Sequence, residues 1–311
     1  MKTVRGTRAI APRPFKLAVL SICAMLGLAL VSAPALAKKP AKKPKAPKIN
    51  VHTPVTPGST YLALGDSVTF GYEEAQVVPA PNYADASSFI GYPELVGSAL
   101  HVNVVNAACP GETSSSMIDP TAPSNGCENA PGGGASYLPT NPLHVKYTGS
   151  QLNYAVSYLK KHKTVRLVSL MIGANDLLLC EETTADHCAS LTEQAAVIGQ
   201  ADKNIGTILT AIRNKAHYRG QIVFVNYYSP TPAQNSVTAL GNASLDSATK
   251  PFHVVIADGF GQFAAGEAHS GGDPCTAGLL TQLSTGGCGI HPSYAGQGLL
   301  AQAVEKAIHL G

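Results

Sequence analysis

The chain has 311 residues, of which 45% are apolar and only 13% are charged, and its formal net charge is +3. This composition is too apolar for a disordered protein, and 30 glycines with 22 prolines exclude a coiled coil. The small positive charge would indicate nucleic-acid binding only if it were spread over the folded part of the chain.

The charge is divided unevenly along the chain. Residues 1–48 contain eleven Lys and Arg residues and no acidic residue. The rest of the chain contains eleven basic and 19 acidic residues, so its net charge is −8. The body of the protein is therefore acidic, and nucleic acid is not an expected partner.

The N-terminus has the pattern of a secretory signal. Residues 1–16 are basic, residues 17–31 form an apolar run, and residues 35–37 (Ala-Leu-Ala) have the small-x-small pattern of a signal-peptidase site. The apolar run is shorter than the roughly 20 residues that cross a membrane. Residues 1–37 are predicted to be a cleaved signal peptide, and the protein is expected to be secreted, either extracellular or associated with the cell wall.

Residues 38–58 are predicted to be a disordered linker that begins with a Lys/Pro-rich tract over 38–48. Such a tract cannot bury enough apolar surface to fold. We expect an extended, solvated spacer, and the alternative is a weak electrostatic contact with an anionic cell envelope. The folded domain is predicted to span 59–311 and to be a monomer.

Short β-rich runs alternate with helical patterns from about Ser59 onward. Strands are predicted at 61–64, 102–106, 165–172, 222–227 and 253–257. Several of these runs are almost continuously apolar, as is typical of strands that are covered on both faces. The alternation predicts a single α/β domain with a parallel sheet, in which ligands bind beyond the carboxyl ends of the strands.

Three helical patterns stand out between and after these strands. Residues 152–159 keep a helical apolar period, and Ser190-x-x-Glu193 is a capping-box pattern at the start of a second helix. A final helix is expected to begin at Pro292.

Six cysteines follow the predicted signal peptide. An even number in an exported chain predicts disulfides, although six cysteines allow 15 connectivities. Sequence proximity suggests the pairs Cys109–Cys127, Cys180–Cys188 and Cys275–Cys288. No metal site is expected, because the chain contains no Cys-x-x-Cys and no His pair at helical spacing.

The first candidate catalytic residue directly follows the first predicted strand. Gly65-Asp66-Ser67 places the Ser67 hydroxyl at a strand-to-helix turn, at the carboxyl edge of the sheet. The same three residue types also form ordinary turns and helix caps. Their meaning therefore depends on the residues at the ends of the other strands.

Three further residues lie in corresponding places. Gly111 follows the second strand, where a glycine lets the backbone N–H approach a ligand. Asn175, in Gly-Ala-Asn-Asp at 173–176, follows the third strand and offers an amide that can stabilise an oxyanion. His291 supplies an imidazole just before the final helix.

This order of residues resembles the SGNH (GDSL-type) hydrolase superfamily over roughly 60–305, and the long loops and cysteines resemble its secreted actinobacterial-type esterase/lipase branch. The resemblance implies a single-domain, three-layer α/β/α fold of the flavodoxin-like type, with a mostly five-stranded parallel sheet. It also implies that Ser67 is the nucleophile, that His291 is its base, and that the oxyanion hole consists of Ser67, Gly111 and Asn175.

The chain departs from the family pattern at one position. The family's acid usually lies three residues before the histidine, where this chain has Cys288, whose sulfur cannot orient an imidazolium as a carboxylate does. Three replacements are open: a backbone carbonyl within 286–289, Asp273, or Asp258. A backbone carbonyl is favoured, because a disulfide-pinned loop can hold a peptide group rigidly.

The sequence thus predicts a secreted serine esterase/lipase that hydrolyses small-molecule or lipid carboxylic esters through an acyl-enzyme. A carbohydrate (acetyl) esterase or a phospholipase would use the same residues, and a non-catalytic cell-wall-binding protein is the alternative outside enzymes. No cofactor is expected: Gly-x-Gly-x-x-Ala at 259–264 is a partial dinucleotide-binding pattern, but it follows the last strand rather than the first.

Overall fold

A computed structural model of the protein describes residues 53–311. The predicted signal peptide and residues 38–52 of the predicted linker lie outside the described residues.

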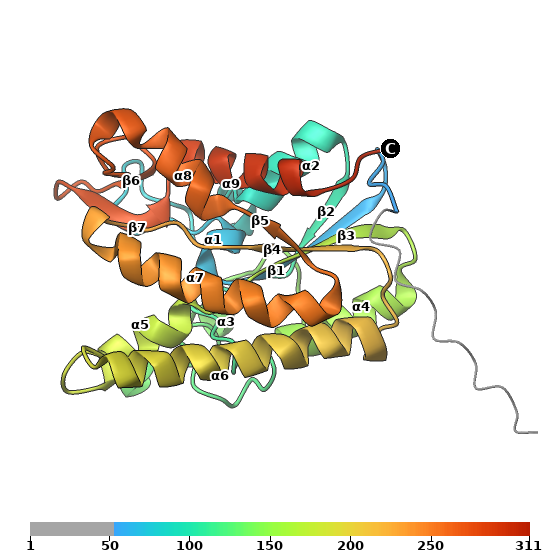
Figure 1. Ribbon diagram of the computed structural model, residues 1–311, viewed down its shortest axis with the longest axis horizontal. Helices are drawn as coiled ribbons and strands as arrows, with labels where there is room; N and C mark the ends of the chain where they lie inside the picture. Colours follow the sequence, from blue (N-terminus) through green and yellow to red (C-terminus); the bar gives the residue numbers. More distant parts are fainter. Residues whose placement is uncertain (1–52) are drawn as a thin grey trace, which may run out of the picture. The chain divides into compact units, whose positions relative to one another are not determined.

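Five parallel strands form the central sheet in the order β2-β1-β3-β4-β5 (Figure 1). They are β1 (Thr60–Gly65), β2 (Asn103–Asn106), β3 (Val165–Met171), β4 (Gln221–Val225) and β5 (Val255–Ala257). The parallel sheet and its five strands confirm the prediction, with strand ends shifted by at most two residues.

The strand order places a crevice between β1 and β3. The chain passes from β1 to β2 on one side and then returns to β3 on the other side of β1. In doubly wound sheets, ligands bind at such a switch point, beyond the carboxyl ends of the two strands. The segments that follow β1 and β3 are those that carry Ser67 and Asn175.

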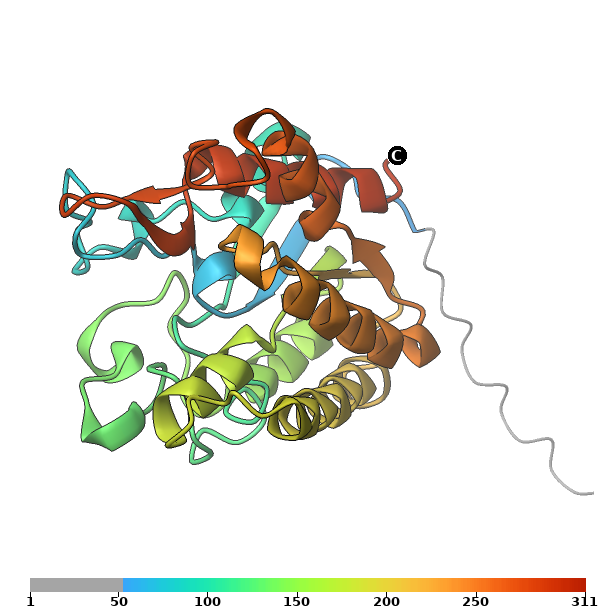
Figure 2. The same ribbon diagram turned by 60° about the vertical axis from the view of Figure 1, so that its left-hand side comes forward.

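Helices cover both faces of the sheet (Figures 1 and 2). One layer consists of α2 (Tyr92–Leu100), α8 (Gly259–Gly266) and α9 (Tyr294–Ala307). The other consists of α4 (Gln151–Lys161), α5 (Ala174–Thr183), α6 (Leu191–Thr210) and α7 (Asn235–Thr249). Successive side chains of a strand point to opposite faces, so Tyr61 and Ala63 pack in the first core and Leu62 and Leu64 in the second. The fold is therefore the expected three-layer α/β/α arrangement.

The helix starts agree only in part with the sequence patterns. Helix α4 covers the expected segment, and the Ser150 side chain caps its N-terminus. Helix α6 begins after Ser190, but this side chain makes no capping hydrogen bond, so the predicted capping box is not formed. Helix α9 begins at Tyr294 with Ser293 as its N-cap, because Pro292 is the last residue of a strand.

That strand belongs to a hairpin that the sequence did not predict. Strands β6 (Leu280–Gln282) and β7 (Cys288–Pro292) pair in antiparallel orientation, and the Cys275–Cys288 disulfide ties the start of β7 to the segment before β6. With so few residues and little apolar content, these strands give no periodic signal. The hairpin is important because its second strand carries His291.

The three disulfides join the pairs that sequence proximity suggests. Cys109–Cys127, Cys180–Cys188 and Cys275–Cys288 bridge 18, 8 and 13 residues. In the chain-entropy account, a bridge over a loop of this size stabilises the folded state by about 3 kcal/mol. The first restrains the segment after β2, the second joins α5 to the loop before α6, and the third restrains β7.

The packed chain starts earlier than the sequence indicates. Val55, within the predicted linker, is buried, and its N–H donates to the carbonyl of His309 at 2.9 Å while its own carbonyl accepts from Gly311 at 3.1 Å. The partner lies at the far end of the chain, so no local pattern could have revealed it. None of the helices within residues 53–311 is long and apolar enough to cross a membrane.

Candidate active site

The end of β1 and a single helical turn position Ser67. Asp66 is the N-cap of α1 (Ser67–Phe70), and its carboxylate accepts a hydrogen bond from the Val68 N–H at 3.0 Å. Gly65 has a φ of 151°, and a Cβ there would lie 2.3 Å from the Met171 carbonyl oxygen of β3. Only glycine allows this close approach, which lets β1 turn sharply and presents Ser67 at the sheet edge.

Asp66 is itself fully buried. Burial raises the pKa of its carboxyl group to about 6, although hydrogen bonds from the Tyr227 hydroxyl and the Val68 N–H work in the opposite direction. Tyr227 follows β4, so this contact links the turn after β1 to the segment after β4. Asp66 thus serves as a structural anchor beneath the serine rather than as a partner of the histidine.

His291 lies between Ser67 and a carboxylate. Its Nε2 is 3.0 Å from the Ser67 Oγ, and its Nδ1 is 2.7 Å from Oε1 of Glu74. The Tyr72 ring and the imidazole pack in a T-shaped arrangement, with the ring centroids 4.9 Å apart. The structure therefore brings together the two residues proposed from sequence and adds an acid that the sequence did not reveal.

Glu74 is held by several donors besides the imidazole. Its Oε1 also accepts the backbone N–H groups of Ile290 at 2.8 Å and His291 at 3.2 Å, and its Oε2 accepts from the Thr281 hydroxyl at 2.5 Å. Burial alone would raise the pKa of Glu74, but the hydrogen bond and charge of His291, together with Thr281, outweigh it and lower the pKa to about 2. Glu74 is therefore ionised throughout the physiological pH range.

This geometry corrects all three candidates for the third member. Asp273 is partly exposed and accepts from the N–H groups of Cys275 and Thr276, while Asp258 caps α8. No carbonyl of residues 286–289 takes the Nδ1 position, because the Glu74 carboxylate occupies it. The acid was not found near the histidine because it lies seven residues after the nucleophile in sequence.

One sequence signal could have pointed to Glu74, though only with the fold known. A Cβ on Gly289 would lie 2.1 Å from Oε1 of Glu74, so the glycine two residues before His291 leaves the space that the carboxylate fills. From sequence alone, Gly289 is one of several glycines in a loop, and Glu74 is one of two adjacent glutamates.

The proposed oxyanion-hole residues also meet at this edge of the sheet. Gly111, Asn175 and Ser67 line the same cavity as His291. Within residues 53–311, neither the Ser67 N–H nor the Gly111 N–H donates to another protein group. Oδ1 of Asn175 accepts from the Asn125 side chain at 3.1 Å, which leaves its amide NH₂ group for a ligand. This is the set of donors that a developing oxyanion requires.

Two buried polar side chains hold the loops of the site in place. Asp176, beside Asn175 on α5, accepts from the Ser114 N–H at 2.8 Å and from its hydroxyl at 2.5 Å. The Gln151 side-chain amide binds both backbone groups of Gly65: its oxygen accepts from the N–H at 2.7 Å, and its NH₂ group donates to the carbonyl at 2.9 Å. Neither role is visible in sequence, because the partners are 62 and 86 residues apart.

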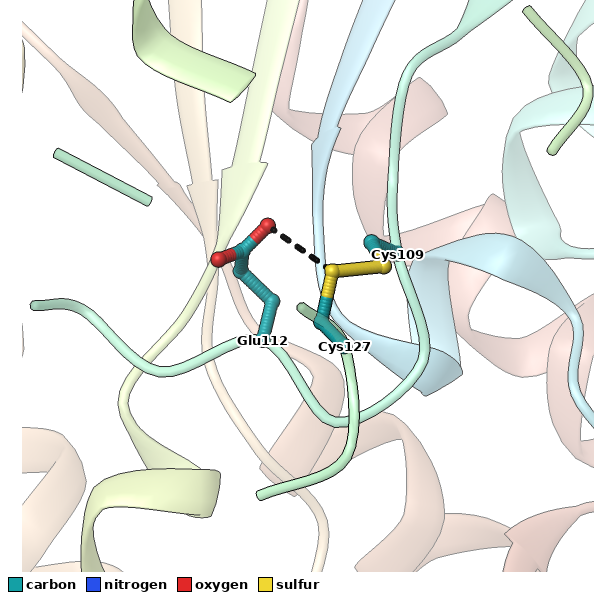
Figure 3. Close-up of side chains that lie close together, drawn as sticks. All are labelled: Cys109, Glu112 and Cys127. Atoms are coloured by element: carbon teal, nitrogen blue, oxygen red, sulfur yellow. Dashed lines mark hydrogen bonds between the residues drawn. A yellow bond between two sulfur atoms is a disulfide. The ribbon is translucent and has the colours of Figure 1, made fainter. Parts of the chain in front are cut away.

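Glu112 lies beneath this edge, next to the Cys109–Cys127 disulfide (Figure 3). It is fully buried, and burial, together with the charge of nearby Glu128, holds the pKa of its carboxyl group well above the usual range. The three side chains in Figure 3 are close enough to suggest a metal site. Both sulfurs are joined to each other, however, so neither offers the thiolate that a metal would need.

Two cavities of different character meet at Ser67. The first, of about 260 Å³, opens between α5, α6 and α7, and its walls are mostly apolar, including Leu177, Ile198, Val237 and Leu245. The second, of about 380 Å³, is lined by polar and tyrosine side chains; among them are Tyr72, Tyr83, Asn125, Tyr137 and Asn141. No Lys or Arg of the described residues lines either cavity.

Comparison with known proteins gives a family and a fold. A family model described as the GDSL-like Lipase/Acylhydrolase family matches residues 63–299. A lipase structure from a goat rumen metagenome is 16% identical, has a TM-score of 0.50, and matches 80% of this chain and 97% of its own. An acetylxylan esterase from Geobacillus stearothermophilus is 15% identical, has a TM-score of 0.48, and matches 82% of this chain and 96% of its own. No curated protein sequence matches the chain.

Proposed function

Since this chain belongs to the GDSL-like lipase/acylhydrolase family and is a carboxylic ester hydrolase, we propose that Ser67 is its nucleophile and that hydrolysis proceeds through an acyl-enzyme. The observation that carries this proposal is the continuous hydrogen-bond chain from Ser67 through His291 to Glu74. A serine hydroxyl is a weak nucleophile by itself, and an adjacent base that a carboxylate orients activates it.

The reaction has two steps. Nε2 of His291 accepts the hydroxyl proton as the Ser67 Oγ attacks the ester carbonyl, and the Ser67 N–H, the Gly111 N–H and the Asn175 amide stabilise the oxyanion. His291 then returns the proton to the leaving alcohol oxygen. In the second step water attacks the acyl-enzyme, His291 again takes and returns a proton, and the carboxylic acid leaves Ser67. Glu74 stabilises the imidazolium that forms in each step.

The two cavities support a division of the substrate. The apolar cavity between α5, α6 and α7 suits an acyl chain, because it offers apolar walls and few groups that would need a hydrogen bond. The polar, tyrosine-lined cavity suits the alcohol part. An acetyl group would leave the first cavity unfilled, so esters of longer acids are favoured over acetylated carbohydrates. A phosphate headgroup would meet no Lys or Arg of residues 53–311 in either cavity.

We further propose that the enzyme is exported after cleavage behind Ala37. The three disulfides support this, because such bonds form and persist in oxidising compartments. N-terminal sequencing of the extracellular protein should begin at Lys38, and an intact Met1 would contradict the proposal. The tract 38–48 is proposed to be a solvated spacer, so its deletion should leave the amount of protein bound to cell walls unchanged; release on deletion would instead support contact with the anionic envelope.

A panel of p-nitrophenyl esters from acetate to palmitate tests the catalytic proposal. Each CH₂ that enters the apolar cavity should stabilise the complex by about 0.8 kcal/mol, so kcat/KM should rise roughly fourfold per CH₂ until the cavity is full. Ser67→Ala should abolish turnover, and Asn175→Ala should lower kcat by about 10²–10³. Full activity of Ser67→Ala would overturn the proposal, and a preference for acetate would overturn the assignment of the acyl cavity.

A further inference from the structure

Asn125 contacts two of the three proposed oxyanion-hole residues. Its backbone N–H donates to the carbonyl of Gly111 at 2.8 Å, and its side-chain Nδ2 donates to Oδ1 of Asn175 at 3.1 Å. Gly111 follows β2 and Asn175 lies in the first turn of α5, so the two donors come from separate parts of the chain. Asn125 is the residue through which they are joined.

The contact with Gly111 restrains the backbone next to a proposed donor. Gly111 has a φ of 81°, and a Cβ on this residue would lie 2.4 Å from the carbonyl oxygen of Asn125. The backbones of Gly111 and Asn125 are therefore in close contact and are also joined by a hydrogen bond. The hydrogen bond holds the peptide that contains the Gly111 carbonyl, and the close approach restricts the Cα that links this peptide to the Gly111 N–H.

The contact with Asn175 fixes which end of an amide faces the substrate. A side-chain amide carries an acceptor oxygen on one side and an NH₂ donor on the other. Because Asn125 donates to Oδ1 of Asn175, the NH₂ group must point the other way, toward the cavity that both residues line. The reverse orientation would bring an oxygen against the developing oxyanion and would repel it.

Asn125 is itself held rigidly. The Cys109–Cys127 disulfide closes the loop around it. Next to it, the N–H and the hydroxyl of Ser124 donate to Asn129 at 2.9 and 2.5 Å, and the Gly126 N–H donates to the Asn129 carbonyl at 2.9 Å. A side chain on so restrained a loop can orient another side chain at low entropic cost.

We propose that Asn125 is a positioning residue of the oxyanion hole, which orients the Asn175 amide toward the substrate carbonyl oxygen and restrains the backbone of Gly111 beside it. This rests on the proposed function, in which Asn175 stabilises the oxyanion. Asn125 itself takes no proton and forms no bond to substrate. Its contribution belongs to the transition state, because only there does the carbonyl oxygen become an anion.

The first test is Asn125→Leu, which keeps the approximate shape of the side chain and removes its donor. The kcat for a p-nitrophenyl ester should fall about 10- to 100-fold, which is the loss typical when a residue that orients a metal ligand is removed. The KM should change little. Asn125→Gln retains a donor and should recover part of the loss. Asn153→Leu makes the same change at an exposed asparagine of α4 that lines neither cavity, and it should leave kcat unchanged.

A double-mutant cycle with Asn175→Ala separates positioning from a general effect on the loop. In the Asn175→Ala background, Asn125→Leu should lower kcat by less than about threefold, because no amide remains to be oriented. If the two losses multiply, or if Asn125→Leu changes KM rather than kcat, Asn125 is not a positioning residue. Should Asn125→Leu not fold, Asn125→Asp replaces it, since a carboxylate cannot donate to Oδ1 of Asn175.

Measuring Ser67→Ala in the same assay distinguishes a failure of the proposed function from a failure of the role proposed for Asn125. If Ser67→Ala retains activity, the proposed function fails. If Ser67→Ala is inactive while Asn125→Leu is as active as wild type, only the role of Asn125 is overturned.

Discussion

Glu74 accepts more hydrogen bonds than the orientation of one imidazole requires. Besides Nδ1 of His291, its carboxylate accepts from two backbone N–H groups of β7 and from the Thr281 hydroxyl of β6. These contacts fasten the loop after α1 to the β6–β7 hairpin. One side chain thus orients the proposed base and also holds the strand that carries it.

The expected consequence of Glu74→Gln is a fall in kcat of about 10⁴, because the variant removes the charge that stabilises the imidazolium. The amide is nearly the same size, so the hairpin contacts are disturbed much less than by truncation. The hydrolysis rate of a p-nitrophenyl ester, compared at equal folded fraction by circular dichroism, measures the effect. Asp273→Asn and Asp258→Asn serve as controls and should retain wild-type kcat; a loss of about 10⁴ in either control, with Glu74→Gln active, would contradict this account.

At the scale of elements, three helices define the space for the acyl chain. Helices α5, α6 and α7 line the apolar cavity that opens beside Ser67, and α6 and α7 are in extensive contact. Ile198 projects from α6 into this cavity and is half-buried, whereas Ala195 of the same helix is exposed and does not line it. The two positions therefore allow a matched pair of substitutions.

A larger side chain at Ile198 should shorten the acyl cavity. Ile198→Trp is predicted to reduce kcat/KM for p-nitrophenyl decanoate by about tenfold or more, while the value for the acetate stays within about twofold, since steric exclusion affects only the longer chain. Ala195→Trp places the same side chain outside the cavity and should leave both values unchanged. An equal loss on both esters would show that the chain does not enter between α5, α6 and α7.

At the scale of the whole molecule, buried carboxyl groups make stability depend on pH. Burial raises the pKa of Glu94 to about 7 and that of Asp66 to about 6, so the folded state holds these protons more tightly than the unfolded chain does. The stabilisation from these two carboxyl groups is fully present below about pH 4, which is near their pKa in the unfolded chain. It is lost as the pH rises through their folded-state pKa values of about 6 and about 7. Glu74, with its lowered pKa, has the opposite sign and loses its contribution only as the pH falls toward about 2.

The free energy of unfolding should therefore decline between about pH 5 and about pH 8. Urea unfolding at several pH values measures this decline, and Glu94→Gln should make it shallower, because the glutamine cannot ionise but can still accept from the Asn106 side chain. A stability that rises over this range in the wild type, or a slope that Glu94→Gln leaves unchanged, would contradict the assignment of these buried groups.

Local sequence patterns predicted the sheet and the residues at its carboxyl edge, but not the features that depend on partners far away in the sequence. Five apolar runs indicated the sheet, and the residues directly after three strands indicated Ser67, Gly111 and Asn175, because parallel strands place their carboxyl ends at one edge. Glu74 and Asn125 were missed, since each acts through a partner that is distant in sequence. The β6–β7 hairpin was missed because its strands are too short to show a periodic pattern. The packing of Val55 was missed because its partners lie at the C-terminus.

The most direct test of the central claim is detection of the acyl-enzyme on Ser67. Wild-type protein mixed with a p-nitrophenyl ester of a long-chain acid and quenched within milliseconds should show a burst of about one nitrophenol per enzyme. Peptide mass spectrometry should then locate one acyl group on the peptide containing Ser67, and Ser67→Ala should show neither burst nor adduct. Steady turnover with no adduct, or an adduct on another residue, would contradict the account.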